Sequence, residues 1–429
     1  MPARHVSRRE FIQHVAAAGV AGPAILTSLS RARAAANERL TLGVIGVGTM
    51  GRGHHLSRFL NYGDVQIVAV CDVVAERRDH SKAKVEEHYA QQTGQGTFRG
   101  CAAYNDFRQL LALDGLDAVL IATPDHWHVP AAILAARAKK DIYCEKPLTL
   151  TIGEGRRLVD EVRAAGVMFQ TGSQQRSEFG GRFRTAVELV RNGRIGRVKT
   201  VRIGVGGPPV PCDLPEEEVP EGTDWNLWLG QAPWRGYNEI LCPKGVHKHF
   251  PAFRNYREYA GGSLADMGAH HFDIAQWALE MDGSGPVKIE PPSGDATTGL
   301  KFTYASGVEM FHGGPTDCTF EGETGTISVS RGKLESTPQE IVKTPLGEND
   351  WRVPPSDNHG RNWLASIKTR RPPICDVETG HRSATVCHLA NLGYQLRRPL
   401  TWDPDKERFV GDDEANGLLN RVPRDPWQL

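Results

Sequence analysis

A glycine-rich turn near the start of the chain is the feature that most restricts its fold. Residues 40–45 form a short apolar run, and three glycines follow at the spacing Gly-x-Gly-x-x-Gly. Between a strand and a helix, the first glycine allows a tight turn, the second lets the backbone approach a pyrophosphate, and the third lets the helix pack on the strand. Free N–H groups at the helix start attract phosphate. The predicted dinucleotide-binding turn contains Gly46, Gly48, Thr49, Met50 and Gly51.

An acidic residue lies where such a turn needs one. A second predicted strand, residues 65–70, is followed by Asp72, 21 residues after Gly51. A carboxylate at this position accepts hydrogen bonds from the adenosine ribose and repels a 2′-phosphate, which favours NAD over NADP. Arg77 and Arg78 follow closely, so the sequence leaves NADP open.

Strands and helices alternate across the rest of this half. Strands are predicted at residues 117–123, 141–144 and 167–171, with helices near 130–138 and 152–165. Such alternation forms a parallel, doubly wound sheet that binds ligands at the carboxyl ends of its strands. We therefore predict a Rossmann domain over residues 37–172. The candidate cofactor contacts at and just beyond this edge are Asp72, Thr123, Pro124, His128, Glu145, Lys146 and Gln174; for Gln174, a purely connecting role is equally open.

The pattern changes beyond residue 173. Short apolar runs are joined by glycine-containing turns, as in a mainly antiparallel sheet. The sequence predicts an α+β domain with a large open sheet over residues 173–429. Its strands are predicted at 198–205, 287–290, 299–304, 308–312 and 326–330, and its helices at 182–192, 264–280, 362–369 and 379–396.

One helix of this second domain carries candidate chemistry. Residues 264–280 are predicted to be helical after a cap at Ser263, which places Asp266, His270 and Asp273 on one face. A carboxylate one turn before a histidine can hydrogen-bond its ring and fix the tautomer. The same spacing also occurs in pairs that only stabilise a helix.

Four motifs together resemble a known family. They are Gly46-Val-Gly48-Thr-Met-Gly51, Ala122-Thr-Pro-Asp-His-Trp-His128, Glu145-Lys146-Pro147 and the stretch from Gly261 to His270. In this order they are similar to those of the glucose–fructose oxidoreductase, inositol dehydrogenase and rhizopine catabolism (Gfo/Idh/MocA) family. The resemblance implies a Rossmann domain, a second domain with a large open sheet, and NAD(P)-dependent redox chemistry on sugars or polyols.

The resemblance also implies the catalytic residues. Lys146, Asp266 and His270 correspond to the family's catalytic lysine, aspartate and histidine. His270 would take the hydroxyl proton as hydride leaves the carbon, and Lys146 would stabilise the developing alkoxide. Asp266 would orient substrate and base.

Two functions of other classes remain open. One is a glycosidase that uses NAD as an internal catalyst through a transient keto sugar. The other is a non-catalytic dinucleotide-binding protein, against which the intact Lys146, Asp266 and His270 argue.

The histidines 247, 249, 270, 271 and 312 lack metal-ligand spacing, so we predict no metal. The aromatic stretch 224–235 fits sugar stacking and core packing equally well.

The first residues read as an export signal rather than as part of the fold. Arg8 and Arg9 precede an apolar run at residues 15–29 and small-x-small cleavage patterns at 32–36. The pair resembles a twin-arginine signal, although Gln13 stands where a lysine is usual. The run is shorter than the ~20 residues of a spanning helix. We predict that residues 1–36 direct the protein to the twin-arginine export machinery and the periplasm, without stable membrane insertion; an ordinary amphipathic helix is the alternative.

Composition excludes some classes of partner. The chain has 51 Lys and Arg against 51 Asp and Glu, whereas nucleic-acid binders usually carry a basic surplus. Its eight cysteines form no Cys-x-x-Cys pair, so neither a zinc knuckle nor a thioredoxin-like motif is expected. We expect a small carbohydrate as substrate, no nucleic acid, and a homo-oligomer.

Overall fold

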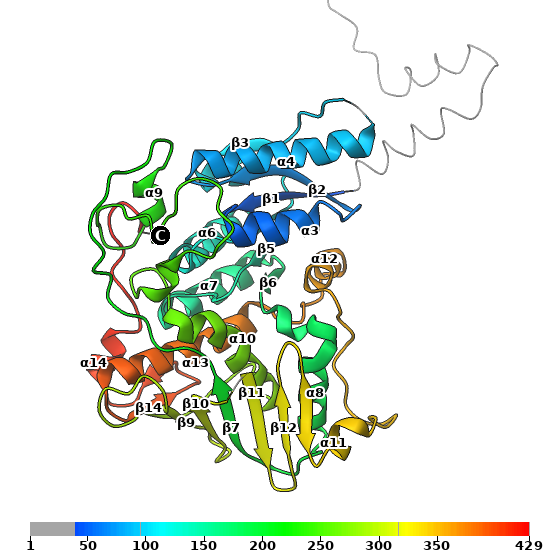
Figure 1. Cartoon of the computed structure of the whole chain (residues 1–429), viewed down its shortest axis with the longest axis vertical. Helices are drawn as coiled ribbons and strands as arrows, with labels where there is room; N and C mark the ends of the chain where they lie inside the picture. The colour runs from blue at the N-terminus through cyan, green and yellow to red at the C-terminus, as the bar shows by residue number, and fades with distance from the viewer. Residues whose placement is uncertain (1–38, 95, 316, 429) are drawn as a thin grey trace, which may run out of the picture.

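The computed structural model describes residues 39–94, 96–315 and 317–428, which form two domains with one sheet each (Figure 1). The first sheet is parallel, with the strand order β3-β2-β1-β4-β5-β6 of a doubly wound Rossmann fold, as predicted. Its strands are β1 (Leu40–Ile45), β2 (Val65–Cys71), β3 (Ala102–Tyr104), β4 (Ala118–Ile121), β5 (Asp141–Cys144) and β6 (Phe169–Thr171). Its main helices are α4 (Ala75–Thr93), α5 (Phe107–Leu111), α6 (Asp125–Arg137) and α7 (Ile152–Ala165).

The second sheet has nine strands in the order β13-β12-β11-β7-β10-β9-β8-β14-β15. Only the pair β7 and β10 runs parallel, so the prediction of a mainly antiparallel sheet is confirmed. Several strands alternate buried and accessible residues, as expected for a sheet covered on one face. The strands are β7 (Val198–Gly204), β8 (Lys288–Glu290), β9 (Lys301–Thr303), β10 (Glu309–His312), β11 (Asp317–Gly322), β12 (Thr326–Val329), β13 (Leu334–Thr337), β14 (Leu400–Asp403) and β15 (Arg408–Phe409).

Three helices cover one face of this sheet and form the core with it: α8 (Arg182–Arg191), α10 (Gly262–Ala278) and α13 (Val377–Leu396). Helix α10 begins two residues earlier than its predicted cap suggests. Its N-cap is Gly261, and Ser263 lies inside the first turn without capping it, so that prediction is wrong. In Figure 1, α10 lies between the two sheets, so one end of it reaches the first domain.

Two later segments return to the first domain. Helix α12 (His359–Thr369) packs Trp363 against Phe59 and Tyr143, with ring centroids 5.9 and 5.6 Å apart. The side chain of Gln170 on β6 also donates to the His359 carbonyl at 2.8 Å. The two domains are therefore interleaved, and their boundary is not a single linker.

Residues 205–261, here called the arm, leave the second sheet and lie against the carboxyl edge of the first. Ala75 donates to the Gly222 carbonyl and Asp224 to the Val73 carbonyl, both at 2.9 Å. The short helix α9 (Trp225–Leu229) places Trp225 and Trp228 in a buried cluster, stacked at 4.7 Å. The aromatic stretch is thus largely core, although Trp234 stays exposed.

Residues 421–428, here called the tail, cross back over the arm (Figure 1, red). The Arg424 guanidinium donates to the carbonyls of Gly230, Ala232 and Asn226. Trp427 packs edge-on against Trp127 of α6 at 5.5 Å. The tail therefore fastens the arm to the first domain.

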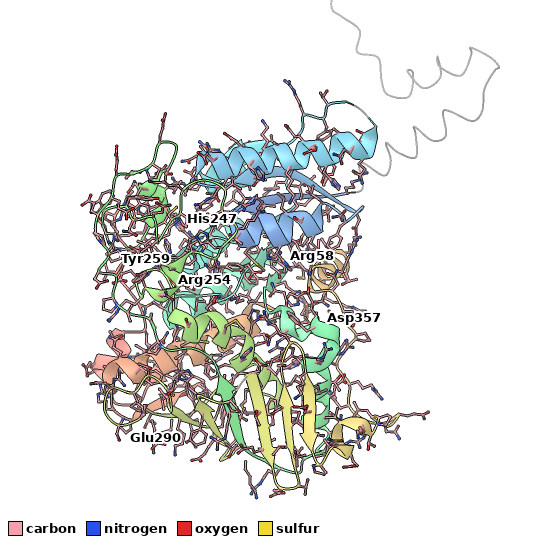
Figure 2. All side chains as sticks on the ribbon, in the orientation of Figure 1. Arg58, His247, Arg254, Tyr259, Glu290 and Asp357 are labelled. Atoms are coloured by element: carbon pink, nitrogen blue, oxygen red, sulfur yellow. The ribbon has the colours of Figure 1, made fainter. Side chains whose placement is uncertain are left out.

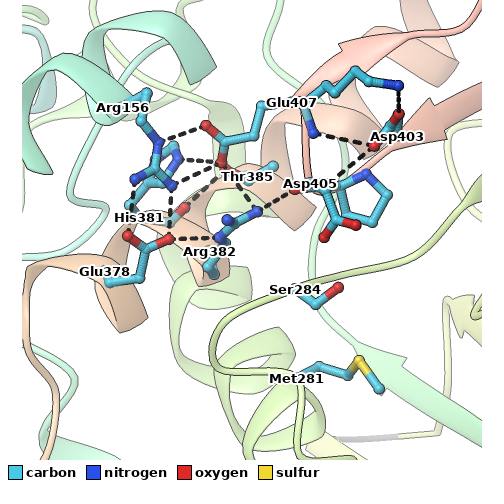
Figure 3. A network of polar contacts seen from close by, with 12 residues as sticks. Arg156, Met281, Ser284, Glu378, His381, Arg382, Thr385, Asp403, Asp405 and Glu407 are labelled. Atoms are coloured by element: carbon cyan, nitrogen blue, oxygen red, sulfur yellow. Dashed lines mark hydrogen bonds and ion pairs between the residues drawn. The ribbon is translucent and has the colours of Figure 1, made fainter. Parts of the chain in front are cut away.

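A charged network joins the domains on another side (Figure 3). Arg156 of α7 forms ion pairs with Glu378 of α13 and with Glu407 beside β15, at 2.6 and 2.7 Å. His381 and Arg382 of α13 complete it by contacting Glu407. Burial raises the pKa of Glu407, but its bonds from His381 and Arg156 outweigh burial and hold the pKa at about 2. Because both carboxylates stay ionised, the network fixes α7 against α13.

The predicted export signal, residues 1–36, lies outside the described residues. Across the part of the chain that the structure does describe, no helix is long and apolar enough to span a bilayer.

Candidate active site

The glycine turn has the shape that a dinucleotide needs. Gly46 has a φ of 84°, and a Cβ there would lie 2.7 Å from the Ala122 carbonyl oxygen. A Cβ on Gly51 would lie 1.9 Å from the Gly46 oxygen, whereas one on Gly48 would meet nothing within 4 Å. The fold itself therefore requires Gly46 and Gly51, while Gly48 faces open space at the start of the π-helical segment η1 (Thr49–Leu56). That open backbone fits a bound pyrophosphate.

Asp72 is held at the end of β2 in the position expected for ribose binding. Its carboxylate accepts the backbone N–H groups of Val47 and Val74 at 2.9 and 3.0 Å. Four lone pairs are available to a carboxylate, so two such bonds leave capacity for hydroxyl groups. The predicted Asp72 contact thus fits the structure.

The two arginines that follow Asp72, Arg77 and Arg78, already bind other groups of the protein. The Arg77 guanidinium donates to the carbonyls of Pro243 and Gly245 in the arm. Arg78 donates to the Asp72 carbonyl at 2.9 Å and to the Asn105 side chain at 3.3 Å. Both guanidiniums are therefore oriented by bonds to other groups of the protein.

A cavity lies over the glycine turn and is roofed by the arm. Thr49 donates its hydroxyl to the His249 carbonyl at 2.7 Å, and Arg52 donates to the His247 carbonyl at 2.5 Å. Figure 2 shows His247 and Arg254 on the arm where it faces the first domain. The lining includes Gly46, Gly48, Thr49, Met50, Asp72, Thr123, Pro124, Trp228, His247 and Phe250.

A second cavity adjoins the first and lies between the domains. The two share Met50, Ala122, Thr123, Phe250 and Arg254, so they form one continuous cleft. The second is lined by most of the predicted catalytic and nicotinamide-side residues. These are Glu145, Lys146, Gln174, Asp266 and His270.

Lys146 and Asp266 meet across the domain boundary. The Lys146 ammonium donates to the Asp266 carboxylate and to the Asp266 carbonyl, both at 2.8 Å. Arg254 approaches the same carboxylate at 3.6 Å. Burial raises the pKa of Asp266, but the charges of Lys146 and Arg254 outweigh it, so the pKa is lowered. A fixed ammonium is thereby held in the second cavity.

His270 lines the same cavity, almost fully buried, with 3% of its surface exposed. Burial, followed by the charges of Lys146 and Arg331, lowers its pKa well below the ordinary value. The ring is therefore neutral near neutral pH, with a nitrogen lone pair available to a hydroxyl donor. Its Nδ1 has no hydrogen-bond partner among the described residues.

The expected hydrogen bond between Asp266 and His270 is wrong, because the Asp266 carboxylate turns to Lys146 instead. Asp273, the third member of the predicted polar stripe, lies outside the cavity. Both of its oxygens accept from the buried Arg176 guanidinium at 2.8 Å. Of the three residues on this helix face, Asp266 and His270 line the cavity, whereas Asp273 forms a structural ion pair with Arg176.

Glu145 and Gln174 form one wall of the second cavity. His55 and Gln174 donate to the same Glu145 oxygen at 2.6 and 2.7 Å. Burial raises the pKa of Glu145, but the contacts with His55, Lys146 and Gln174 outweigh it and hold the pKa at about 2. Gln174 also donates to the Tyr143 hydroxyl at 3.0 Å, so it belongs to the site and is more than a connection.

His128 does not line either cavity, contrary to the prediction of a cofactor contact. Its two ring nitrogens lie 2.7 Å from the Pro147 carbonyl and 3.0 Å from the Thr123 carbonyl. The ring thus joins the loops after β4 and β5, and it positions Thr123 and Lys146 from behind.

Sequence reasoning missed five titratable residues of the second cavity: His54, Asp125, Glu178, Arg254 and Arg331. Asp125 stands inside a quoted motif, and burial raises its pKa to about 7. Arg254 lies in the short 3₁₀ helix Ala252–Asn255 and Arg331 in the turn between β12 and β13; neither stretch has a periodicity that marked the residue in the sequence.

Within the described residues, no group of three or more His, Cys, Asp or Glu side chains could hold a metal ion. His247 and His249 lie on the arm, while His312 contacts the Tyr394 hydroxyl at 2.6 Å in the core of the second domain. All eight cysteines are free thiols.

A Rossmann turn, an open-sheet domain and a cleft between them define the class of two-domain dinucleotide-dependent oxidoreductases. Residues 40–173 match the "Oxidoreductase family, NAD-binding Rossmann fold", and residues 211–429 match the "Oxidoreductase family, C-terminal alpha/beta domain". The chain therefore belongs to the Gfo/Idh/MocA oxidoreductase family.

Curated relatives carry related names. The chain is 31% identical over 263 residues to myo-inositol 2-dehydrogenase of Thermotoga maritima, covering 60% of this chain and 61% of that protein. It is 30% identical over 211 residues to a glycosyl hydrolase family 109 protein of Saccharopolyspora erythraea, covering 45% and 44%. The match thus spans about three fifths of the inositol dehydrogenase and less than half of the hydrolase.

Solved structures share the fold. The aldose-aldose oxidoreductase from Caulobacter crescentus, solved with glycerol, superposes with a TM-score of 0.57 at 18% identity, over 85% of this chain and 99% of that one. The WlbA dehydrogenase from Bordetella pertussis, solved with NADH and UDP-GlcNAcA, gives 0.55 at 18% identity with the same coverage.

Proposed function

We propose that the protein is an NAD(P)-dependent oxidoreductase that acts on a secondary hydroxyl of a sugar, polyol or glycoside. The observation that carries this proposal is the single cleft that joins the open glycine turn to Lys146, Asp266 and His270. The relative named as a myo-inositol 2-dehydrogenase supports a polyhydroxylated substrate.

The nicotinamide cofactor supplies the hydride acceptor, and the chain's own residues handle the proton and the charge. His270 is neutral and lines the cavity, so it can take the hydroxyl proton as the alkoxide develops. The Lys146 ammonium, fixed by Asp266, stabilises that negative charge without having to reorganise. Asp266 therefore acts through Lys146, rather than through His270.

We propose that the cofactor is NAD. Asp72 would lie against a 2′-phosphate, and both nearby guanidiniums are already bonded to backbone carbonyls. An unpaired phosphate beside a carboxylate is unfavourable, while ribose hydroxyls satisfy the remaining Asp72 lone pairs.

We further propose that the cofactor stays bound between turnovers. The arm roofs the cavity over the glycine turn, and Thr49, Arg52 and Arg77 fasten the arm there. Purified protein should release NAD(H) on denaturation in near-stoichiometric amount, although none was added. Retention through dialysis corresponds to a dissociation constant below micromolar, or more than ~8 kcal/mol of binding. Protein that purifies empty and turns over added NAD freely would contradict this.

A second candidate is a glycosidase that oxidises a sugar carbon, eliminates the aglycone, adds water and returns the hydride. Two relatives are named glycosyl hydrolase family 109 proteins. Asp125 supplies a further protonatable group in the same cavity, because burial raises its pKa to about 7. A panel of polyols, sugars and aryl glycosides, followed by nicotinamide absorbance and by product analysis, separates the two functions. Net nicotinamide reduction identifies the dehydrogenase, and aglycone release without net reduction identifies the glycosidase.

We also propose that residues 1–36 export the folded protein through the twin-arginine route, and that the active enzyme is a homo-oligomer. Export of a folded protein suits a cofactor that is loaded before transport. Fusing residues 1–36 to a reporter that crosses the membrane only when folded should place it in the periplasm. Changing Arg8→Lys together with Arg9→Lys should stop export, and unchanged export would refute the twin-arginine assignment.

A further inference from the structure

One cation of the second cavity forms no direct ion pair with any described residue. Three carboxylates of the lining are already paired: Glu145 with His55, Glu178 with Arg58, and Asp266 with Lys146. The fourth, Asp125, has its pKa raised to about 7 by burial and is not fully ionised.

Among the cationic residues of this lining, Lys146 and Arg254 both lie within 4 Å of Asp266. Arg331, in the turn between β12 and β13, forms no ion pair with any described residue. The charges of Asp317 and Asp266 act on this guanidinium from a distance, but neither carboxylate forms a direct ion pair with it.

Arg331 is nevertheless held in a defined orientation. Its Nε donates to the Gln175 side chain at 3.0 Å, and its guanidinium lies 4.8 Å from the centre of the Phe179 ring. Gln175 is buried and donates its own amide to the His270 carbonyl at 3.4 Å. One buried side chain thus connects Arg331 to the residue that would act as the base.

This arrangement leaves the two Nη groups without a hydrogen-bond partner among the described residues. A guanidinium fixed through Nε and one face presents a fork of parallel N–H donors, which matches a carboxylate. Arg331 is an exposed residue that also lines the cavity, so a ligand can reach it from solvent.

We propose that the substrate is an anionic sugar, whose carboxylate binds Arg331 while its reacting hydroxyl lies at Lys146 and His270. This inference rests on the proposed oxidoreductase function and names its substrate class. A sugar acid gains a charge-assisted contact that a neutral polyol cannot form. A phosphate could also bind the fork, so phosphorylated sugars form a separate arm of the test.

The test compares D-glucuronate, D-glucose and D-glucose 6-phosphate on the full-length protein, using wild type, Arg331→Gln and Lys333→Gln. Lys333 is the matched control, since it lies in the same turn, is exposed and is absent from the cavity lining. Hydrogen bonds to charged groups contribute about 1.5–3 kcal/mol, or roughly 10- to 150-fold. Arg331→Gln should lower the kcat/KM ratio of glucuronate to glucose by this factor, mainly through KM, while Lys333→Gln leaves the ratio unchanged.

Ligand-induced stabilisation gives a second readout that needs no turnover. Glucuronate should raise the Tm of wild type and of Lys333→Gln, but not that of Arg331→Gln. If glucuronate stabilises the wild type in this way without being oxidised, the anion site stands and the proposed reaction fails. If glucose is oxidised as well as glucuronate, or Arg331→Gln affects both equally, the reaction stands and the anion site is wrong. A preference for glucose 6-phosphate that depends on Arg331 would show that the site binds a phosphate, and it would overturn the proposal of a substrate carboxylate.

Discussion

Replacing Lys146 with alanine is expected to lower kcat by ~10²–10³, because the ammonium stabilises charge that develops only in the transition state. Arg254, the other cation near Asp266, lies 3.6 Å from that carboxylate and also donates to the Pro251 carbonyl, so it is already bound to other groups. Retained NAD(H) should be unaffected, because Lys146 lines the second cavity and not the first. Single-turnover reduction of the bound nicotinamide measures the effect directly.

Replacing His270 with alanine removes the proposed proton acceptor. We therefore expect kcat to fall by ~10²–10⁴. His271→Gln is the matched control, because His271 is equally buried but lies outside the cavity lining. Near-normal turnover in either Lys146→Ala or His270→Ala would refute the assigned chemistry.

The pH profile provides an independent check. Because burial and the charges of Lys146 and Arg331 lower the pKa of His270, the ring stays neutral below its usual value of about 6.5. Activity of the wild type should therefore persist below pH 6.5 and fall only as the pH drops through the lowered pKa. Removing Lys146 removes one of the charges that depress the pKa. The residual activity of Lys146→Ala should accordingly fall at a higher pH than that of the wild type.

Gly48→Val is expected to abolish cofactor retention while leaving the fold intact. Gly48 has φ −66° and ψ −161°, a conformation open to any residue, and its position for a Cβ is empty. The added side chain would fill the space through which the backbone approaches a pyrophosphate. We expect NAD(H) released on denaturation to drop from near-stoichiometric to undetectable, with an unchanged circular dichroism spectrum. Full retention in this variant would show that the dinucleotide binds elsewhere.

Gly51→Ala is the contrasting variant three residues away. Its Cβ would lie 1.9 Å from the Gly46 oxygen, so η1 must move from β1. We expect a loss of about 1–3 kcal/mol in the free energy of unfolding, as for other overpacked sites, measured by thermal denaturation. The pair separates a glycine needed by the ligand from a glycine needed by the fold.

The first domain was predictable because each of its signals is local. The glycine spacing, the buried strands and Asp72 lie within short stretches whose periodicity is visible. The mainly antiparallel character of the second sheet was predicted, but its strands β11, β13, β14 and β15 were missed, since short strands with one solvent-facing side resemble loops.

Site residues were predicted correctly where residues of a sequence motif face the cleft. They were missed or misassigned where contacts between distant segments determine which groups a side chain meets. Asp266 and Asp273 share a helix face, yet one meets Lys146 and the other Arg176. His128 lies in a motif but joins two loops. Arg254 and Arg331 enter the cavity from segments far along the chain, and only the folded packing brings them there.

The tail has a consequence for the order in which the molecule assembles. The cleft over the glycine turn is roofed by the arm, and the arm is fastened by Arg424 and Trp427, which lie near the other end of the described chain. Contacts between such distant segments close large loops, so they form after local ones. The parallel sheet can therefore fold while the cleft above it is still open to a dinucleotide. Cofactor binding and the last steps of folding would then occur together. Without the cofactor, the chain would accumulate in a state whose arm is not yet bound to the first domain.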